Sequence, residues 1–269
     1  MHDIIIFCKS YRGDIERFAV LHRSIFRFNP ESIPFYAVVP QEDLQIFRER
    51  FSRDVTFLAD DDVADISIAG QNWIGQQLVK FNFYKCKIAK NFLMVDSDFF
   101  FIKDVRKSDL LVNSDVPFTV ISSKENFLQG LLRKDDVEYV SMLNEVLSLM
   151  GRAKTHMKRS GPDLYFMPGP IWSSKVLENM DEKFMKPNNF SYYDILRYCP
   201  FENNWYGEWA LASQCIPIVP IEPLFKEYVR EKFVQEDKER GMTLKTLSRF
   251  YHGLSLSSKW NPMIEWEGE

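Results

Sequence analysis

The sequence predicts an α/β fold with a mainly parallel central sheet. Over the first 95 residues, short apolar runs alternate with segments whose apolar residues recur at helical spacing. Such alternation is typical of parallel strands joined by right-handed helical crossovers. A chain of 269 residues can bury one large core, so we expect a single domain, 1–269.

The elements of the first half follow from local patterns. Residues 4–7 are continuously apolar, as in a strand buried on both faces, and in residues 14–28 the apolar side chains repeat at helical spacing. The same reasoning predicts further strands over 35–39, 55–59 and 92–95, and further helices over 42–51 and 73–89.

The pattern weakens in the second half. We expect a strand over 117–121, helices over 137–150, 172–179 and 203–214, and a short strand over 216–219. Residues 161–170 contain too many prolines and glycines for an ordinary strand. The basic stretch 152–159 could bind an acceptor phosphate, but it suits a solvated loop better.

Composition excludes several classes of protein. The net charge is −4 and the isoelectric point is near 5.7, which disfavours a nucleic-acid partner because phosphates require a basic surface. The four cysteines are scattered and form no Cys-x-x-Cys pair, so neither a zinc site nor a disulfide framework is indicated. Neither a signal peptide nor a transmembrane segment is recognisable. We therefore expect a cytoplasmic protein, with peripheral contact at the inner face of the membrane left open.

Asp96-Ser97-Asp98 is the most informative motif. Ligands of open parallel sheets bind beyond the carboxyl ends of the strands, where residues 8–14 and 96–98 should lie. Two carboxylates two residues apart can reach one cation, and their hard oxygens suit Mg²⁺ or Mn²⁺ bridging a diphosphate. The acidic run Asp60–Asp62 has a similar composition but opens a polar loop, so we interpret it as solvated.

Two other enzyme classes place carboxylates after a strand. Haloacid dehalogenase phosphatases need Thr or Val where this chain has Phe100, and their motif lies near the start of the domain. Nucleotidyltransferases need a glycine-rich phosphate loop, which does not follow residues 4–7. A non-catalytic sugar-nucleotide-binding module is a further alternative that the sequence leaves open.

Four segments in order, residues 9–14, 73–80, 92–98 and 201–207, resemble a bacterial family of GT-A-type glycosyltransferases with an Asp-x-Asp motif. Members of that family are often encoded with capsule or lipopolysaccharide assembly. In the last segment Asn203 stands where the family usually has Tyr. The resemblance implies a GT-A-like (Rossmann-like) fold, a nucleoside diphosphate sugar as donor, Mn²⁺ or Mg²⁺, and a glycan or lipid-linked acceptor. Residues 1–122 would form the nucleotide-sugar-binding half and residues 123–269 the acceptor-side half; a UDP-sugar is favoured by analogy with Mn²⁺-dependent relatives.

The resemblance also implies residues that bind the nucleotide. The first loop would offer hydrogen bonds and a stacking ring, although a helix cap and a turn explain the same residues. Gln77 and Lys80 share a helix face, from which Lys80 would neutralise phosphate unless it is an exposed lysine. With the metal-bridging carboxylate, the expected set is Lys9, Ser10, Tyr11, Asp14, Gln77, Lys80 and Asp96.

A late histidine completes the metal shell in the similar family of glycogenin and lipopolysaccharide galactosyltransferases. His252 is the candidate beside Asp96 and Asp98, although a single histidine is more often structural. That family's motif continues with Lys and Trp, and here Lys259 follows at a different spacing. Lys259 would assist the departing diphosphate.

Glu202 and Glu208 are the candidates for acid–base catalysis. An inverting transfer needs a carboxylate that deprotonates the acceptor hydroxyl. Glu202 stands at an expected helix start, where capping would explain it equally well, and Glu208 follows by about two turns and could face solvent. The sequence leaves inversion and retention open.

Overall fold

The structure is a computed structural model, and it describes residues 1–51, 54–70, 72–122 and 124–257. Five strands form the central sheet in the order β3-β2-β1-β4-β9. The first four are parallel, and β9 runs antiparallel at the edge beside β4. They span β1 (His2–Lys9), β2 (Phe35–Val39), β3 (Thr56–Ala59), β4 (Ala89–Asp96) and β9 (Ile171–Ser173). The predicted α/β class with a mainly parallel sheet is confirmed.

Helices cover both faces of this sheet because its central strands are apolar on both sides. On β1, Ile6 packs toward α1 (Ile15–Phe28) and α2 (Leu44–Arg50), whereas Phe7 packs toward the opposite face. That second face is covered by α3 (Trp73–Asn82), α7 (Ser174–Met180), α8 (Tyr192–Tyr198) and α9 (Glu202–Ser213).

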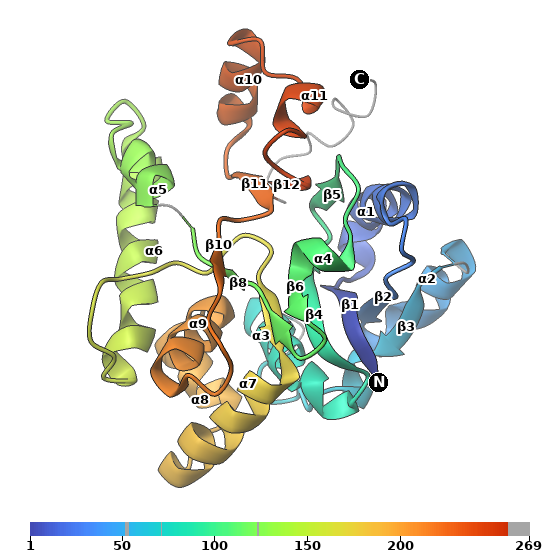
Figure 1. The fold of residues 1–269 in the computed structure, drawn as a ribbon, viewed down its shortest axis with the longest axis vertical. Coiled ribbons are helices and arrows are strands. Elements are labelled where there is room, and N and C mark those ends of the chain that lie inside the picture. Colours follow the sequence, from blue (N-terminus) through green and yellow to red (C-terminus); the bar gives the residue numbers. More distant parts are fainter. Residues whose placement is uncertain (52–53, 71, 123, 258–269) are drawn as a thin grey trace.

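A second, smaller sheet is connected to the first through the turn after β4. It has the order β11-β12-β5, with β11 (Phe225–Tyr228) parallel to β12 (Gly253–Leu256) and β12 antiparallel to β5 (Phe99–Phe101). Helices α10 (Glu231–Glu239) and α11 (Leu244–Leu247) lie beside it (Figure 1). Because β5 begins three residues after β4 ends, the turn containing Asp98 joins the two sheets.

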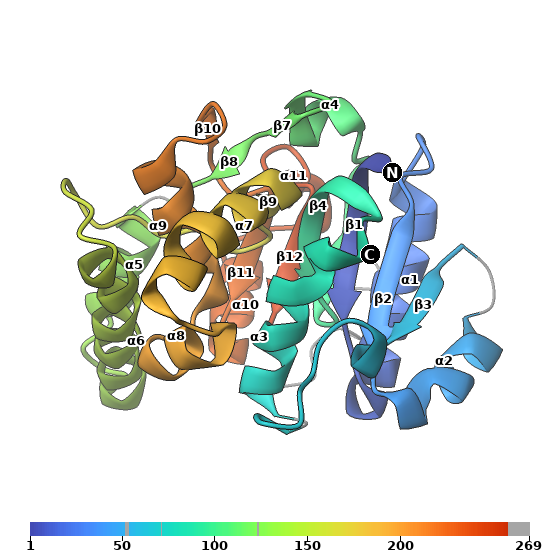
Figure 2. The ribbon, with the colours of Figure 1, turned by 90° about the horizontal axis from the view of Figure 1, so that it is seen from below.

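The remaining elements extend the second half of the chain. Helices α5 (Lys124–Leu131) and α6 (Val137–His156) lie at one end of the molecule, and α2 and β3 lie at the other (Figures 1 and 2). The short elements are α4 (Lys107–Leu110), the pair β6 (Leu111–Asn113) and β7 (Val116–Pro117), and the pair β8 (Thr119–Val120) and β10 (Pro220–Ile221). Single turns of 3-10 or π type occupy Arg12–Asp14, Gln41–Asp43, Asp60–Asp62, Phe83–Cys86, Asp181–Met185 and Lys186–Asn188.

The second half departs from the predicted elements in several places. Helix α6 continues to His156 through most of the basic stretch, and Trp172 lies in β9 rather than in a helix. The predicted strand over 216–219 is absent from these described residues, and β10 lies just beyond it. In the described ranges, no helix has the length and hydropathy needed to cross a membrane.

Candidate active site

The turn between the two sheets is anchored to the end of the neighbouring strand. Asp96 is the last residue of β4 and pairs in register with Lys9 of β1. Ser97 is buried, and its hydroxyl donates a hydrogen bond to the Ser10 hydroxyl at 2.8 Å. This bond holds the turn, so Asp96 and Asp98 are fixed at the carboxyl ends of the central strands.

Lys80 of α3 is the positive charge of the site. Its Nζ lies 2.8 Å from Asp96 Oδ1 and 3.1 Å from Glu202 Oε1. Burial opposes a charge on Lys80, but Asp96 and Glu202 outweigh it and raise the pKa of Lys80. Lys80 is therefore a charged, buried lysine that links α3, β4 and α9.

Glu202 accepts hydrogen bonds from two buried side chains, Lys80 and Gln77. The side-chain amide of Gln77 satisfies its hydrogen bonds when its nitrogen faces Glu202. In that orientation the Gln77 amide nitrogen donates to both Glu202 carboxylate oxygens, at 2.8 and 2.9 Å. The Gln77 amide oxygen then accepts from Trp73 Nε1 at 2.6 Å. Both Glu202 oxygens thus accept hydrogen bonds. Burial raises the pKa of Glu202, and the Lys80 charge counteracts that shift.

Asp98 has a different environment from Asp96. No basic side chain in the described part of the chain lies within ion-pair distance of its carboxylate. Burial, followed by the negative charges of Asp96, Asp14 and Glu227, raises the pKa of Asp98 to about 8. Without a cation, the ionised form of Asp98 is therefore disfavoured, because no described basic side chain compensates its charge.

Glu227 is a site residue that the sequence analysis missed. It lies on β11 in register with Ser255 of β12, which pairs in turn with Phe99 of β5, next to Asp98. Partial desolvation, and then the charge of Asp96, raise the pKa of Glu227 to about 7, although its side chain is open to solvent in the cavity. Nothing in the local pattern Phe-Lys-Glu-Tyr marks this residue; only the pairing of three distant strands brings it to Asp98.

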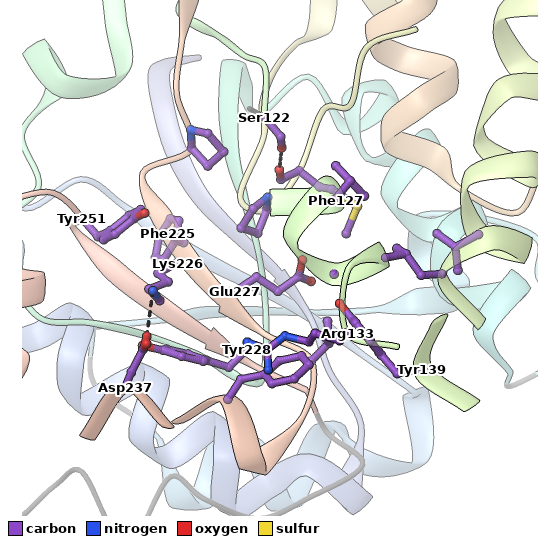
Figure 3. A pocket seen from close by; sticks show the side chains of 18 of the residues that line it. Ser122, Phe127, Arg133, Tyr139, Phe225, Lys226, Glu227, Tyr228, Asp237 and Tyr251 are labelled. Atoms are coloured by element: carbon purple, nitrogen blue, oxygen red, sulfur yellow. Dashed lines mark hydrogen bonds and ion pairs between the residues drawn. The ribbon is translucent and has the colours of Figure 1, made fainter. Parts of the chain in front are cut away.

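These side chains line a small cavity of about 170 Å³. Its walls include the segment 167–170, Asn203 and Ser257, and its acidic residues are Asp96, Asp98, Glu202 and Glu227. Met167, Pro168, Glu227 and Val229 also line a second cavity of about 1100 Å³, so the two adjoin. Figure 3 shows Glu227 and Tyr139 reaching into the larger cavity from different walls.

The donor groups fit a hard divalent cation held partly by a substrate. Among the described residues, no three His, Cys, Asp or Glu side chains are grouped closely enough to hold a metal ion by themselves. Mg²⁺ and similar cations are commonly bound by one or two carboxylates together with substrate phosphates and water. Asp96 and Asp98 supply such a pair, and a cation would favour the ionised form of Asp98, which has no basic partner among the described side chains.

The first loop contributes mostly internal contacts. Lys9 is buried, and its Nζ lies 3.4 Å from Asp60 Oδ2 and 3.1 Å from the Ser10 carbonyl oxygen. Asp14 pairs with Arg17 at 2.7 Å. Among the four predicted loop residues, Tyr11 presents the exposed ring, with 43% of it accessible. The interpretation of Asp60 as a solvated loop residue is wrong, since Asp60 is fully buried against Lys9.

Two further predicted residues, His252 and Glu208, are not brought to the carboxylates. The backbone carbonyl of His252, just before β12, accepts a hydrogen bond from Ile102 N. The backbone carbonyl of Asp98 accepts one from Leu256 N at the other end of β12, so His252 and Asp98 lie at opposite ends of that strand. The His252 ring instead bonds to the Asp104 carbonyl through Nδ1, at 2.8 Å. Glu208 is buried in an ion pair with Arg159 and does not border the small cavity. Lys259 lies outside the described residues.

Comparison with known proteins identifies a family and two similar folds. The model of a family of unknown function, DUF6492, matches residues 3–199. No curated protein sequence matches the chain. The apo structure of mouse xyloside xylosyltransferase 1 is 9% identical, with a TM-score of 0.48 over 95% of this chain and 98% of that one. The apo structure of the WbbM bifunctional glycosyltransferase is 12% identical, with a TM-score of 0.49 over 94% of this chain and 45% of that one.

Proposed function

The chain belongs to the family of unknown function DUF6492, and from its site we propose that it is a glycosyltransferase with a nucleoside diphosphate sugar as donor. One observation carries the proposal. Asp96 and Asp98 stand at the carboxyl end of a central parallel strand, in a small acidic cavity that adjoins a much larger one. Strand ends of this kind bind nucleotides in α/β sheets, and the adjoining cavity leaves room for a second substrate.

The donor would lie over the ends of β1 and β4. Asp96 and Asp98 would hold Mn²⁺ or Mg²⁺, which when bound stabilises negative charge on the departing diphosphate as a Lewis acid. Lys80 holds Asp96 in place through its 2.8 Å ion pair and adds a positive charge near the phosphates. The exposed ring of Tyr11 offers a stacking surface for the base.

The acceptor would approach from the larger cavity. Its hydroxyl oxygen forms a bond to the anomeric carbon of the donor sugar as the bond from that carbon to the diphosphate breaks. Glu227 borders both cavities, so we propose that it accepts the hydroxyl proton in an inverting transfer. Glu202, the base favoured by the sequence pattern, accepts hydrogen bonds at both oxygens, and we propose that it positions Lys80.

The proposed donor, acceptor and biological setting rest on the family resemblance of the sequence. By that analogy we propose a UDP-sugar as donor and a glycan or lipid-linked acceptor. The setting would be bacterial surface polysaccharide synthesis in the cytoplasm. These specifics are independent of the site geometry, and each can fail without the proposed reaction class failing.

Titration calorimetry tests the donor site directly. We expect one of UDP, GDP, CDP and TDP, with UDP favoured, to bind in Mn²⁺ and to lose at least about tenfold in affinity in EDTA, because bridging cations dominate diphosphate binding. Asp98→Asn should lose binding to a similar extent. Asp61→Asn, which removes an exposed carboxylate from a neighbouring loop, should bind as the wild type does. Equal affinity in Mn²⁺ and EDTA would exclude a metal-bridged donor.

A further inference from the structure

The larger cavity has the dimensions of a ligand site. At about 1100 Å³ it exceeds what one sugar ring fills and lies at the upper end of small-molecule sites. Its walls come from α5, α6, β11 and α10 (Figure 3). Glu227 is the charged group that it shares with the acidic cavity.

Much of the wall is apolar. Phe127 of α5 faces Tyr165 with ring centroids 4.1 Å apart, and Tyr139 of α6 meets Phe233 of α10 edge-on at 5.1 Å. Met142 and Leu143 extend the same wall along α6. Aromatic rings and methionines of this kind bind the apolar faces of sugars and hydrocarbon chains.

The basic residues of the lining are already neutralised. Arg133 lies 2.7 Å from Glu236, Lys226 lies 2.9 Å from Asp237, and Arg240 lies 3.7 Å from Asp237. The described lining residues thus include three cations and four carboxylates. The carboxylates are Glu222, Glu227, Glu236 and Asp237. Lys226 and Arg240 share Asp237, and the lining as a whole carries one more carboxylate than cation, so an anionic ligand is disfavoured and a neutral ligand is favoured.

Two residues of the cavity lining, which we call the rim, have large and exposed apolar side chains. Phe250 is 73% exposed and Leu132 is 57% exposed, and both line the cavity. Leu128, one helical turn before Leu132, is also exposed. Exposed apolar groups gathered around a cavity mark a binding surface for an apolar group.

We propose that this cavity binds a neutral glycoside with an apolar aglycone, its sugar hydroxyl toward Glu227 and its aglycone against Leu132 and Phe250. As the acceptor site this assignment rests on the proposed glycosyltransferase function. As a binding site it stands on the cavity alone.

Binding of short amphiphiles to the whole chain, below their micelle concentrations, tests the chemistry. The probes are octyl β-D-glucopyranoside, octyl β-D-galactopyranoside, their methyl counterparts and octyl phosphate, titrated by ligand-observed NMR. Burying about half of the seven additional methylenes should make the tighter octyl glycoside bind about 100-fold more strongly than its methyl counterpart. Octyl phosphate should bind at least about tenfold more weakly than that glycoside. Equal binding of methyl and octyl glycosides, or preference for the phosphate, would overturn the proposal.

Rim substitutions locate the site. Phe250→Ser and Leu132→Ser should each weaken octyl glycoside binding by about fivefold, the usual effect of a peripheral apolar contact. Phe26→Ser and Val112→Ser remove exposed apolar side chains remote from the cavity lining, 73% and 44% accessible, and should change nothing. Equal effects of rim and control substitutions would place the amphiphile elsewhere and refute the assignment.

Nucleoside diphosphate titrations on the same variants separate the two proposals. If Mn²⁺-dependent nucleotide binding persists while no octyl glycoside binds, the cavity assignment fails and the proposed function stands. If octyl glycosides bind at the rim but no nucleotide binds, the donor site fails and the cavity assignment stands.

Discussion

Lys9 and Asp60 form a buried ion pair at the edge of the candidate donor site. Their side chains are 2% and 0% exposed, and Lys9 Nζ lies 3.4 Å from Asp60 Oδ2. Burial lowers the pKa of Lys9, and the negative charge of Asp60 counteracts that shift. A carboxylate that holds a buried charge in this way contributes to folding rather than to ligand binding.

Asp60→Asn should therefore destabilise the protein. Removing one partner of a buried ion pair leaves the other uncompensated, so we expect the free energy of unfolding to fall by about 3 kcal/mol. Asp62→Asn, in the same turn but exposed, should change it by less than about 0.5 kcal/mol. Urea denaturation of both variants makes the comparison. Equal stabilities would mean that the ion pair contributes nothing.

Glu227→Gln separates donor binding from transfer. A general base acts only when the acceptor hydroxyl reacts, so nucleotide affinity in Mn²⁺ should persist while transfer falls about 100-fold or more. Glu231→Gln, an exposed carboxylate on α10, serves as the control. NMR of the product gives the anomeric configuration. Full activity with inversion, or a retained configuration, would remove this role from Glu227.

The sequence could predict candidate site residues of α3, β4 and α9 but not their partners. Helical spacing put Gln77 and Lys80 on one face, and Glu202 stood at an expected helix start. That Lys80 bonds Glu202, 122 residues away, depends on how α3 and α9 pack over the sheet. Spacing along a chain carries no information about such contacts.

The same reason explains which elements were predicted. In the first half each strand or helix has its own apolar period, so β1 to β4 follow from local pattern. In the second half β11 and β12 span four residues each, and they are ordered by pairing with each other and, for β12, with β5. Their register decides that Glu227 approaches Asp98 and that His252 lies at the far end.

A double-mutant cycle tests the link between α3 and α9. Lys80→Gln leaves Asp96 and Glu202 without their shared cation and should lower the free energy of unfolding by about 3 kcal/mol. Adding Glu202→Gln removes one of the two carboxylates left unpaired by Lys80→Gln, so the double variant should be more stable than Lys80→Gln alone. Lys85→Gln, an exposed lysine just beyond the same helix, should have little effect. Strict additivity of the two substitutions would show that the pair is not coupled.

At the scale of the whole molecule, the two sheets contribute to different parts of the proposed site. The central sheet and its strand ends carry the donor side, whereas the small sheet with α5, α6 and α10 surrounds the larger cavity. The turn at Asp96–Asp98 joins the sheets, which is why the reacting groups of both substrates would meet there. The predicted division at residue 122 remains a prediction.

Release of nucleoside diphosphate from a panel of nucleotide sugars tests the central claim most directly. The full chain is incubated with each donor and the octyl glycosides in Mn²⁺, and both products are followed by chromatography. We predict release from at least one donor with a matching glycosylated product, abolished by EDTA and reduced at least about 100-fold in Asp98→Asn. A donor that binds in Mn²⁺ but is never cleaved would identify a sugar-nucleotide-binding module. Cleavage that persists unchanged in EDTA and in Asp98→Asn would contradict the assignment of the site.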